Sequence, residues 1–411
     1  MSRTMQDSGI PWVGSVPSDW GIALTSSLFH EHKEKNIGMK ENNLLSLSYG
    51  NIIRKNINTN EGLLPQSFET YNVIEVNDIV FRLTDLQNDK RSLRTGLCRE
   101  NGIITSAYVT IRPSVDLDSR FFHYLFHSYD VCKVFYGMGE GVRQGMGYDD
   151  VKKMKVIIPS LPEQQAIADY LDKKCSEIDE LISLQEKIID ELTAYKQSII
   201  TEAVTKGLNP DVPMKDSGIE WIGKIPERWV IKRLKFFASR YNEKVGNQKL
   251  PYIGLENIES FSEKYIETDS QYDISQAMLC RIGDVIFGKL RPYLGKAMVI
   301  KEPSCCSSEF IVLKSEVPRY LRYLMLSNGF IEVVNASTYG TKMPRANADF
   351  IMNMSVVCPS EKEQQVIVSF LDKKCSEIDE MISIKQSKIE ALKEYKKSLI
   401  YECVTGKKDV I

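Results

Sequence analysis

The chain has 411 residues, of which 43% are hydrophobic and 26% are charged, so a wholly disordered protein is excluded. Its 53 Lys and Arg residues nearly balance 55 Asp and Glu residues, which excludes a uniformly basic nucleic-acid-binding surface but allows local basic patches. No run approaches about 18 apolar residues, and the first residues lack the apolar core of a secretory signal. Nine scattered cysteines without a C-x-x-C pair predict free thiols in a reducing cytoplasm.

The first part of the chain predicts a mixed helix-and-strand region behind a short block at residues 7–20. Short β-branched or aromatic runs predict strands at Ser46–Ile53, Asp78–Leu83 and Ile103–Ile111. A helix with one apolar face is predicted over Arg120–Tyr129.

One long helix is predicted from Pro162 to about Val204. Pro162 suits a first helical turn, Glu163 favours the positive end of the helix dipole, and Gly207 ends the helix. Apolar residues recur about every seven positions, which is coiled-coil spacing, and Gln185 interrupts this seam. A helix of this length, about 63 Å at 1.5 Å per residue, needs a partner helix.

The second half of the chain repeats this order of elements. A block at residues 216–229 matches residues 7–20, and Lys385 interrupts the second seam where Gln185 interrupts the first. The predicted strands are Tyr252–Ile258, Asp284–Phe287 and Phe310–Leu313, and the predicted helices are Pro318–Ser327 and Glu363–Val404.

An internal repeat relates the two long helices. The ten residues Leu171–Glu180 are identical to Leu371–Glu380, and 25 of 43 positions are identical when 163–205 is aligned with 363–405. The regions before the helices share only scattered positions. The two halves therefore share one fold, in which a constant part suggests a common scaffold or partner and a variable part suggests two recognised targets.

Positive charge is enriched in the variable regions relative to the helices. Residues 230–356 carry 17 Lys and Arg against 13 Asp and Glu, whereas the helix region 160–206 carries 5 against 10. A polyanion would therefore bind the variable regions.

Two basic loops follow predicted strands at equivalent places in the two halves. Each loop alone fits an ordinary solvated loop, but the occurrence of basic loops at equivalent places in both halves favours a binding role. Arg, Lys, Gln and Asn are the residue types that contact phosphates and base edges. The candidate DNA-binding residues are Arg82, Lys90, Arg91 and Arg94 in the first loop, and Lys289, Arg291, Tyr293 and Lys296 in the second.

A glycine-rich segment at 137–147 contributes further candidates. It follows a predicted helix rather than a strand, and its counterpart at 339–345 lacks most of the glycines, so a dinucleotide-binding loop is rejected. The candidate DNA-binding residues here are Arg143 and Gln144 in the first half, and Lys342 and Arg345 in the second.

No cofactor, metal or catalytic residue is predicted. His123 and His127 have the i, i+4 spacing of metal ligands, but no H-E-x-x-H motif accompanies them, so they are predicted to be packing or surface histidines. A P-loop is absent, and no Pro-Pro pair exists to form the D/N-P-P-Y/F motif of aminomethyltransferases. These absences favour a recognition protein over an enzyme.

Several motifs resemble the specificity subunits of type I restriction–modification systems. They are the block Lys215–Trp229, the segment P-S-L-P-E-Q-Q-A-I-A-D-Y-L-D-K-K at Pro159–Lys174, and the helix end Ala194–Gly207. One departure is Ser360-Glu361-Lys362, which lacks the second proline of the first copy. With the second copies included, the resemblance covers essentially the whole chain.

The resemblance implies an α+β fold in which two mixed target-recognition domains are separated by two long antiparallel coiled-coil helices, with an internal pseudo-two-fold repeat. Each recognition domain would read one half of a bipartite asymmetric site in double-stranded DNA. The helices would set the spacing and dock two methyltransferase subunits, with restriction and translocase subunits joining through the complex and no membrane involved. The implied segments are 1–20, the N-terminal block; 21–158, recognition domain 1; 159–207, long helix 1; 208–229, a linker with the repeated block; 230–358, recognition domain 2; 359–406, long helix 2; and 407–411, a tail.

Two alternatives from other classes stay open. One is a coiled-coil scaffold that does not read DNA, against which the basic loops weigh. The other is a lone DNA-modifying enzyme, against which the missing cofactor and catalytic motifs weigh.

Overall fold

The computed structural model divides into two compact units. Unit 1 consists of residues 1–184 and 388–411, and unit 2 consists of residues 185–387. Both long helices pass from one unit into the other, so each unit contains part of each helix. The residues that the structure describes are 3–57, 67–86, 93–138, 145–246, 249–268, 276–340 and 342–410.

The two long helices are present nearly as predicted. Helix α3 spans Leu161–Lys206 and helix α7 spans Glu361–Val404. At the start of α3, the Glu163 carboxylate accepts hydrogen bonds from the backbone N–H and the hydroxyl of Ser160, at 3.0 and 2.9 Å. Gly207 ends α3 with a left-handed φ of 78° and donates to the Ala203 carbonyl. The same capping contacts of Ser360 and Glu363 begin α7.

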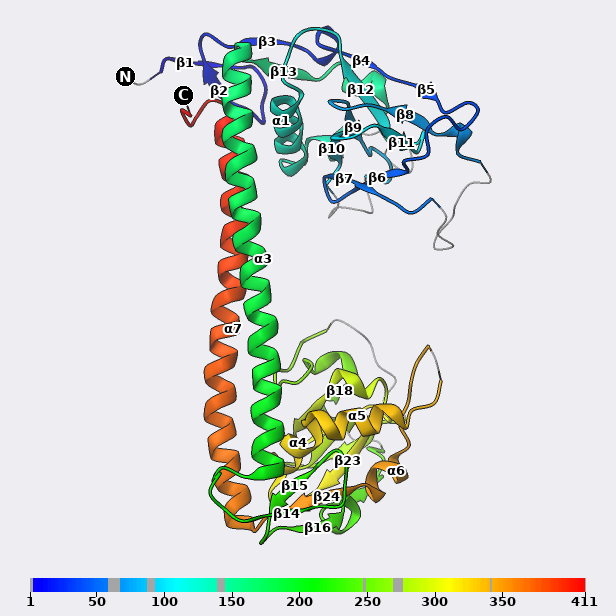
Figure 1. The fold of residues 1–411 in the computed structure, drawn as a ribbon, viewed down its shortest axis with the longest axis vertical. Helices are drawn as coiled ribbons and strands as arrows, with labels where there is room; N and C mark the ends of the chain where they lie inside the picture. The colour runs from blue at the N-terminus through cyan, green and yellow to red at the C-terminus, as the bar shows by residue number, and fades with distance from the viewer. Residues whose placement is uncertain are drawn as a thin grey trace. The chain divides into compact units, whose positions relative to one another are not determined.

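Unit 1 holds the first variable region, built from short strands and two short α-helices (Figure 1). Its strands are β1 (Met5–Asp7), β2 (Ser15–Pro17), β3 (Gly21–Leu24), β4 (Phe29–Glu31), β5 (Glu34–Lys35), β6 (Leu45–Ser48), β7 (Asn51–Arg54), β8 (Asn72–Ile74), β9 (Ile79–Phe81), β10 (Thr95–Leu97), β11 (Gly102–Ile104), β12 (Val109–Pro113) and β13 (Lys155–Ile158). Its helices besides the long ones are α1 (Ser119–Val131), α2 (Tyr148–Val151) and short 3-10 turns at Thr25–Ser27, Phe68–Thr70 and Val134–Gly137. The described strands form sheets of order β10-β9-β12-β4 and β11-β8-β5, with separate pairs β1-β2, β3-β13 and β6-β7.

Unit 2 repeats this plan with the second variable region. Its strands are β14 (Met214–Asp216), β15 (Lys224–Pro226), β16 (Val230–Arg233), β17 (Ser239–Tyr241), β18 (Tyr252–Ile253), β19 (Met278–Cys280), β20 (Val285–Gly288), β21 (Ala297–Val299), β22 (Ser304–Cys306), β23 (Phe310–Lys314) and β24 (Ser355–Cys358). Its helices are α4 (Pro318–Leu326), α5 (Asn328–Ala336), α6 (Ala348–Asn353) and 3-10 turns at Leu234–Phe236, Leu255–Asn257 and Pro292–Leu294. The described strands form sheets of order β17-β23-β20-β21 and β18-β22-β19, with pairs β14-β15 and β16-β24.

The core of each unit joins its variable region to both long helices. In unit 1, the buried phenyl rings of Phe121, Phe122 and Phe126 on α1 pack in one cluster with Leu171 of α3 and Leu399 of α7. In unit 2, an equivalent cluster combines residues of α4 and α5 with α3 and α7. The two helices lie side by side within each unit (Figure 1), which supplies the partner that so long a helix needs.

Some predicted strands proved to be two elements. Ser46–Ile53 forms β6 and β7, because Tyr49 and Gly50 adopt positive φ values of 45° and 82° and reverse the chain between them. The predicted strand Ile103–Ile111 is likewise divided into β11 and β12. The prediction for Tyr252–Ile258 was wrong beyond Ile253, where a 3-10 turn follows. A run of β-branched residues cannot reveal a turn that side-chain packing decides.

All nine cysteines are free thiols, as predicted. Among the described residues, the helices are too short or too polar to cross a membrane.

Candidate nucleic-acid interface

The structure brings two of the predicted basic segments of unit 2 together. Strand β20 leads into Lys289, and the backbone beyond it pairs with the segment around Arg345 through an isolated bridge from Leu290 to Arg345. The Arg291 N–H donates to the Pro344 carbonyl at 2.7 Å, and the Ala346 N–H donates to the Lys289 carbonyl at 2.9 Å. Two loops more than 50 residues apart in the sequence therefore form one surface.

We define the unit 2 basic cluster as Lys289, Arg291, Tyr293, Lys342 and Arg345. Arg291, Tyr293, Lys342 and Arg345 are exposed. Arg345 forms an ion pair with Glu309. Burial lowers the pKa of the half-buried Lys289 ammonium, and Glu309 opposes that effect. Four cationic side chains therefore belong to this cluster, and one of them is paired with the Glu309 carboxylate. An excess of positive charge of this kind favours a phosphate backbone.

Arg291 adopts a backbone conformation that non-glycine residues rarely use. Its φ of 49° lies in the left-handed region, immediately before the 3-10 turn Pro292–Leu294. This conformation costs an L-residue about 1–2 kcal/mol. Residues held in such a conformation concentrate at functional sites, and Arg291 is also exposed.

Lys296 lies apart from this cluster. Its ammonium donates to the Leu255 carbonyl at 2.7 Å, and burial lowers its pKa. This hydrogen bond stabilises the loop. Direct contact of Lys296 with DNA stays a prediction.

Unit 1 shows the same backbone arrangement at its equivalent loop. The Met146 N–H donates to the Leu83 carbonyl at 3.0 Å, which matches the Ala346-to-Lys289 bond of unit 2. Arg82 is half-buried at the end of β9. Lys90, Arg91, Arg143 and Gln144 lie outside the described residues.

Arg94 is fully buried rather than presented on the surface. Its guanidinium donates to the carbonyls of Thr84 and Asp85 at 2.8 and 3.3 Å and lies over the Tyr136 ring, 5.5 Å from its centroid. These contacts shape the basic loop from inside, and a direct contact of Arg94 with DNA stays an untested prediction. The sequence could not separate this arginine from its neighbours, because only tertiary packing buries it.

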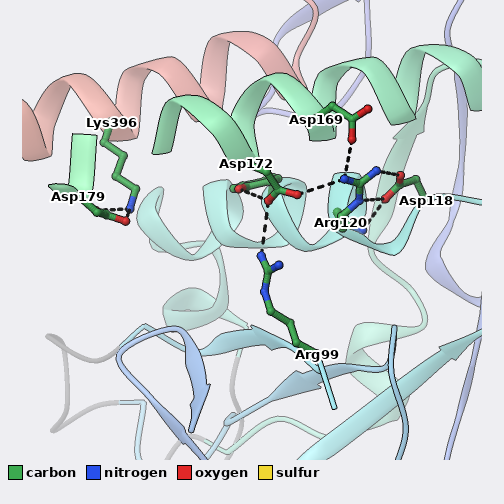
Figure 2. A network of polar contacts seen from close by, with 8 residues as sticks. Arg99, Asp118, Arg120, Asp169, Asp172, Asp179 and Lys396 are labelled. Atoms are coloured by element: carbon green, nitrogen blue, oxygen red, sulfur yellow. Dashed lines mark hydrogen bonds and ion pairs between the residues drawn. The ribbon is translucent and has the colours of Figure 1, made fainter. Parts of the chain in front are cut away.

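The identical decapeptide of the repeat anchors each variable region to its long helix. The Tyr124 hydroxyl donates to Asp172 at 2.8 Å, and the Tyr323 hydroxyl donates to Asp372 at 2.8 Å. Figure 2 shows Arg120 held by Asp118, Asp169 and Asp172 together. These anchors were not predicted from the sequence, although the identity of Asp172 and Asp372 at an offset of 200 was an available signal.

A second pair of contacts joins α3 to α7 within each unit. In unit 1, the Lys396 ammonium contacts the Asp179 carboxylate at 2.6 Å (Figure 2). In unit 2, the Lys196 ammonium contacts the Asp379 carboxylate at 2.7 Å. Because the pairs use the same repeat positions, they fix the same register between the two helices in both units.

His123 and His127 are half-buried on α1 and line a cavity together with residues of the long helices. Burial lowers the pKa of His123 to about 3, with smaller effects from His127 and Arg99. Burial also lowers the pKa of His127 to about 4, with smaller effects from Lys396 and Lys397. No group of three or more potential ligands in the described parts of the chain could hold a metal ion. Both imidazoles are therefore neutral near pH 7.

These buried histidines predict acid sensitivity of unit 1. Between about pH 6.5 and pH 4 the unfolded chain binds more protons than the folded chain, so the free energy of unfolding should decrease as the pH falls. His127→Leu, which introduces the residue found at the matching position 326, should reduce this decrease by up to about 1.4 kcal/mol per pH unit. Urea unfolding at pH 7 and pH 5 measures the effect, with His30→Gln on the exposed face of β4 as the control. Equal acid sensitivity in His127→Leu and the unsubstituted chain would contradict it.

Comparison with known protein families matches residues 97–194 and 226–394 to the type I restriction modification DNA specificity domain. The chain belongs to this family. The resemblance predicted from the repeated blocks is thereby confirmed, together with a fold of mixed helix and strand that includes a long helix at α3.

Relatives of this specificity-domain protein agree with that assignment. It is 26% identical over 339 residues to the type I restriction enzyme MjaVIII specificity subunit of Methanocaldococcus jannaschii, with 75% of each chain covered. It is 22% identical over 428 residues to the putative type I restriction enzyme MjaX specificity subunit of the same organism, with 96% and 95% covered. A solved structure from work on complex assembly of the type I R-M system has a TM-score of 0.67 at 13% identity. It covers 95% of this chain and 99% of that one, and shows a similar fold.

Proposed function

We propose that this chain is the DNA sequence-recognition subunit of a type I restriction–modification complex. Residues 21–158 and 230–358 each read one half of a bipartite asymmetric site, and the chain performs no catalytic step itself. The observation that carries the proposal is the unit 2 basic cluster, in which two separate loops are paired through their backbones into one cationic and aromatic surface. The same backbone hydrogen bond occurs in unit 1, which supports two DNA-recognition regions built on one plan.

Exposed residues of the repeated decapeptide support a shared partner. Lys173, Ser176 and Glu180 are exposed, and so are their identical counterparts at 373, 376 and 380. Packing inside the chain does not require exposed residues to be identical, whereas two copies of one partner would. We assign these surfaces to two methyltransferase subunits, with restriction and translocase subunits joining through the complex.

The test is whether the chain confers sequence specificity on its partners. The purified chain and its methyltransferase subunits are incubated with a random DNA library, and the methylated positions are sequenced. Methylation confined to one bipartite motif supports the proposal. Methylation by the chain alone would indicate a lone modifying enzyme. Assembly with the methyltransferase but without any motif would indicate a scaffold that does not read DNA.

The proposed role of the helices predicts a change in spacer length. A seven-residue heptad is inserted after Lys187 in α3 and after Ser387 in α7, which are equivalent positions of the two copies. Seven residues add about 10 Å at 1.5 Å per residue, and DNA rises about 3.4 Å per base pair, so the spacer should lengthen by about three base pairs. A heptad also preserves the coiled-coil seam. Methylation protection of DNAs that differ only in spacer length measures the change.

Insertion into α3 alone is the control. It shifts the register between the helices and should prevent assembly rather than lengthen the spacer. An unchanged spacer preference in the doubly extended chain, with activity intact, would contradict a spacing role for the helices.

A further inference from the structure

Unit 1 contains a cavity of about 480 Å³ that the recognition function does not use. It lies where the turn between β6 and β7, helix α1, and the long helices α3 and α7 meet. The lining residues that matter here are Tyr49, Arg99, His123, Asp172, Glu180 and Lys396. The His123 Nδ1 atom is shielded from solvent and lacks a hydrogen-bond partner among the described residues.

Unit 2 has an equivalent cavity that is smaller, about 200 Å³. Both cavities are lined by the same repeat positions, including Cys175 and Cys375, Asp179 and Asp379, and Lys396 and Lys196. The matching contacts of Tyr124 and Tyr323 align α1 with α4, so that Arg322 occupies the position of His123.

A guanidinium group lines the unit 2 cavity. The Arg322 side chain is nearly fully buried, donates to the Ala297 carbonyl at 3.0 Å, and lies 3.3 Å from the Glu263 carboxylate. Unit 1 replaces this long cationic side chain with the shorter His123. The larger volume of the unit 1 cavity is the expected consequence of that exchange.

One carboxylate at the unit 1 cavity favours a cation over an anion. Of the three lining carboxylates, Asp172 is paired with Arg99 and Arg120, and the others are Asp179 and Glu180. The two histidines are neutral because burial holds their pKa values at about 3 and about 4. Asp179 is paired with Lys396, whereas no ion pair to Glu180 occurs among the described residues. A carboxylate without an ion-pair partner and two tyrosine rings can accept a planar cation.

We propose that the unit 1 cavity binds a guanidinium group in the place that Arg322 fills in unit 2. Glu180 accepts its N–H donors, and Tyr49 or Tyr124 contacts its face. The group belongs either to a free guanidino compound or to an arginine of a partner subunit.

The test uses methylguanidinium and the full-length chain labelled with 15N at histidine. The chain contains four histidines, so the imidazole resonances are resolvable. Methylguanidinium should shift the His123 and His127 resonances saturably, in the millimolar range, and leave those of His30 and His32 unchanged. Acetate at the same concentration should shift none of them. Saturable shifts caused by acetate, or equal shifts of all four histidines, would overturn the proposal, and so would the absence of any shift.

Matched variants separate binding from folding. Glu180→Gln should weaken methylguanidinium binding about tenfold, as expected for loss of one charge-assisted contact. Glu380→Gln changes the identical residue of unit 2, which does not line the unit 2 cavity, and should have no effect. His123→Arg should abolish methylguanidinium binding, because it supplies a guanidinium from within the chain. The His127 resonance reports this loss of binding. Equal effects of Glu180→Gln and Glu380→Gln would contradict the assignment of the site.

The assembled complex distinguishes the two sources of the group. Hydrogen exchange at the His123 ring carbon, followed by mass spectrometry, reports the cavity in a large assembly. If the His123 ring carbon is protected from exchange in the complex, and added methylguanidinium does not increase this protection, the bound group is an arginine of a partner subunit. Protection that still depends on methylguanidinium identifies a free guanidino compound. The result with the isolated chain decides the proposal itself, and it does not depend on DNA recognition.

Discussion

Exchange of residues 21–158 for the corresponding region of a related specificity subunit is expected to replace one half of the recognised DNA site and leave the other half unchanged. The structure supports these junctions because β3 pairs with β13, so that Gly21 lies opposite Ile158. The variable region therefore leaves the constant part and returns to it at one place. The variable region also contacts the constant part where it packs against α3 and α7.

The donor region must retain the contacts that hold the variable region on α3. These are the hydrogen bond from Tyr124 to Asp172 and the ion pairs of Arg120 with Asp169 and Asp172. A donor with tyrosine and arginine at these positions should assemble at wild-type yield. Tyr124→Phe in the unexchanged chain is the control, because it weakens the anchor and should leave the recognised motif unchanged.

Sequencing of methylated DNA from cells that carry the exchanged chain and its methyltransferase measures the outcome. Discrimination between the old and new half-sites should exceed a thousandfold, because several base contacts change together. A change in both half-sites, in a complex that assembles normally, would show that the two regions do not read independently.

Arg291→Ala is expected to weaken recognition of one half-site by about 10–100-fold, which corresponds to about 1–3 kcal/mol. Arg291 is exposed, stands in a strained left-handed conformation, and is fixed through its N–H by the Pro344 carbonyl. Alanine also carries a Cβ atom, so the substitution removes the guanidinium without relieving the backbone strain. A loss of affinity can therefore be assigned to the side chain.

Salt dependence separates the two kinds of contact that Arg291 could make. If it contacts a base, Arg291→Ala should relax one position of the motif; if it contacts a phosphate, affinity should fall for all sequences and the salt slope should decrease by about one. Quantitative binding of the assembled complex to motif variants at several salt concentrations distinguishes these results. Arg233→Ala, an exposed cation on β16 of the same unit, is the control. Unchanged affinity and specificity would exclude Arg291 as a reading element.

The sequence by itself determined the parts of this protein that depend on local patterns. The two long helices follow from a seven-residue apolar repeat, with Pro162 and Glu163 in the first turn of the first copy and Gly207 after it. The duplicated plan follows from 25 identities in 43 aligned positions. The family followed from the same repeated blocks, because their order and spacing cover almost the whole chain.

Only the tertiary structure decided which basic residues form a surface. Lys289, Arg291 and Arg345 converge because backbone bonds join two loops that are distant in the sequence. Arg94 and Arg322 have the same residue type but are buried, one beneath a loop and one in a cavity. Periodicity reports the faces of single elements, whereas burial depends on which elements pack against them. The difference in volume between the cavities at His123 and Arg322 likewise appears only when α1 and α4 pack against the long helices. The packing around a side chain decides how its volume and charge change a cavity.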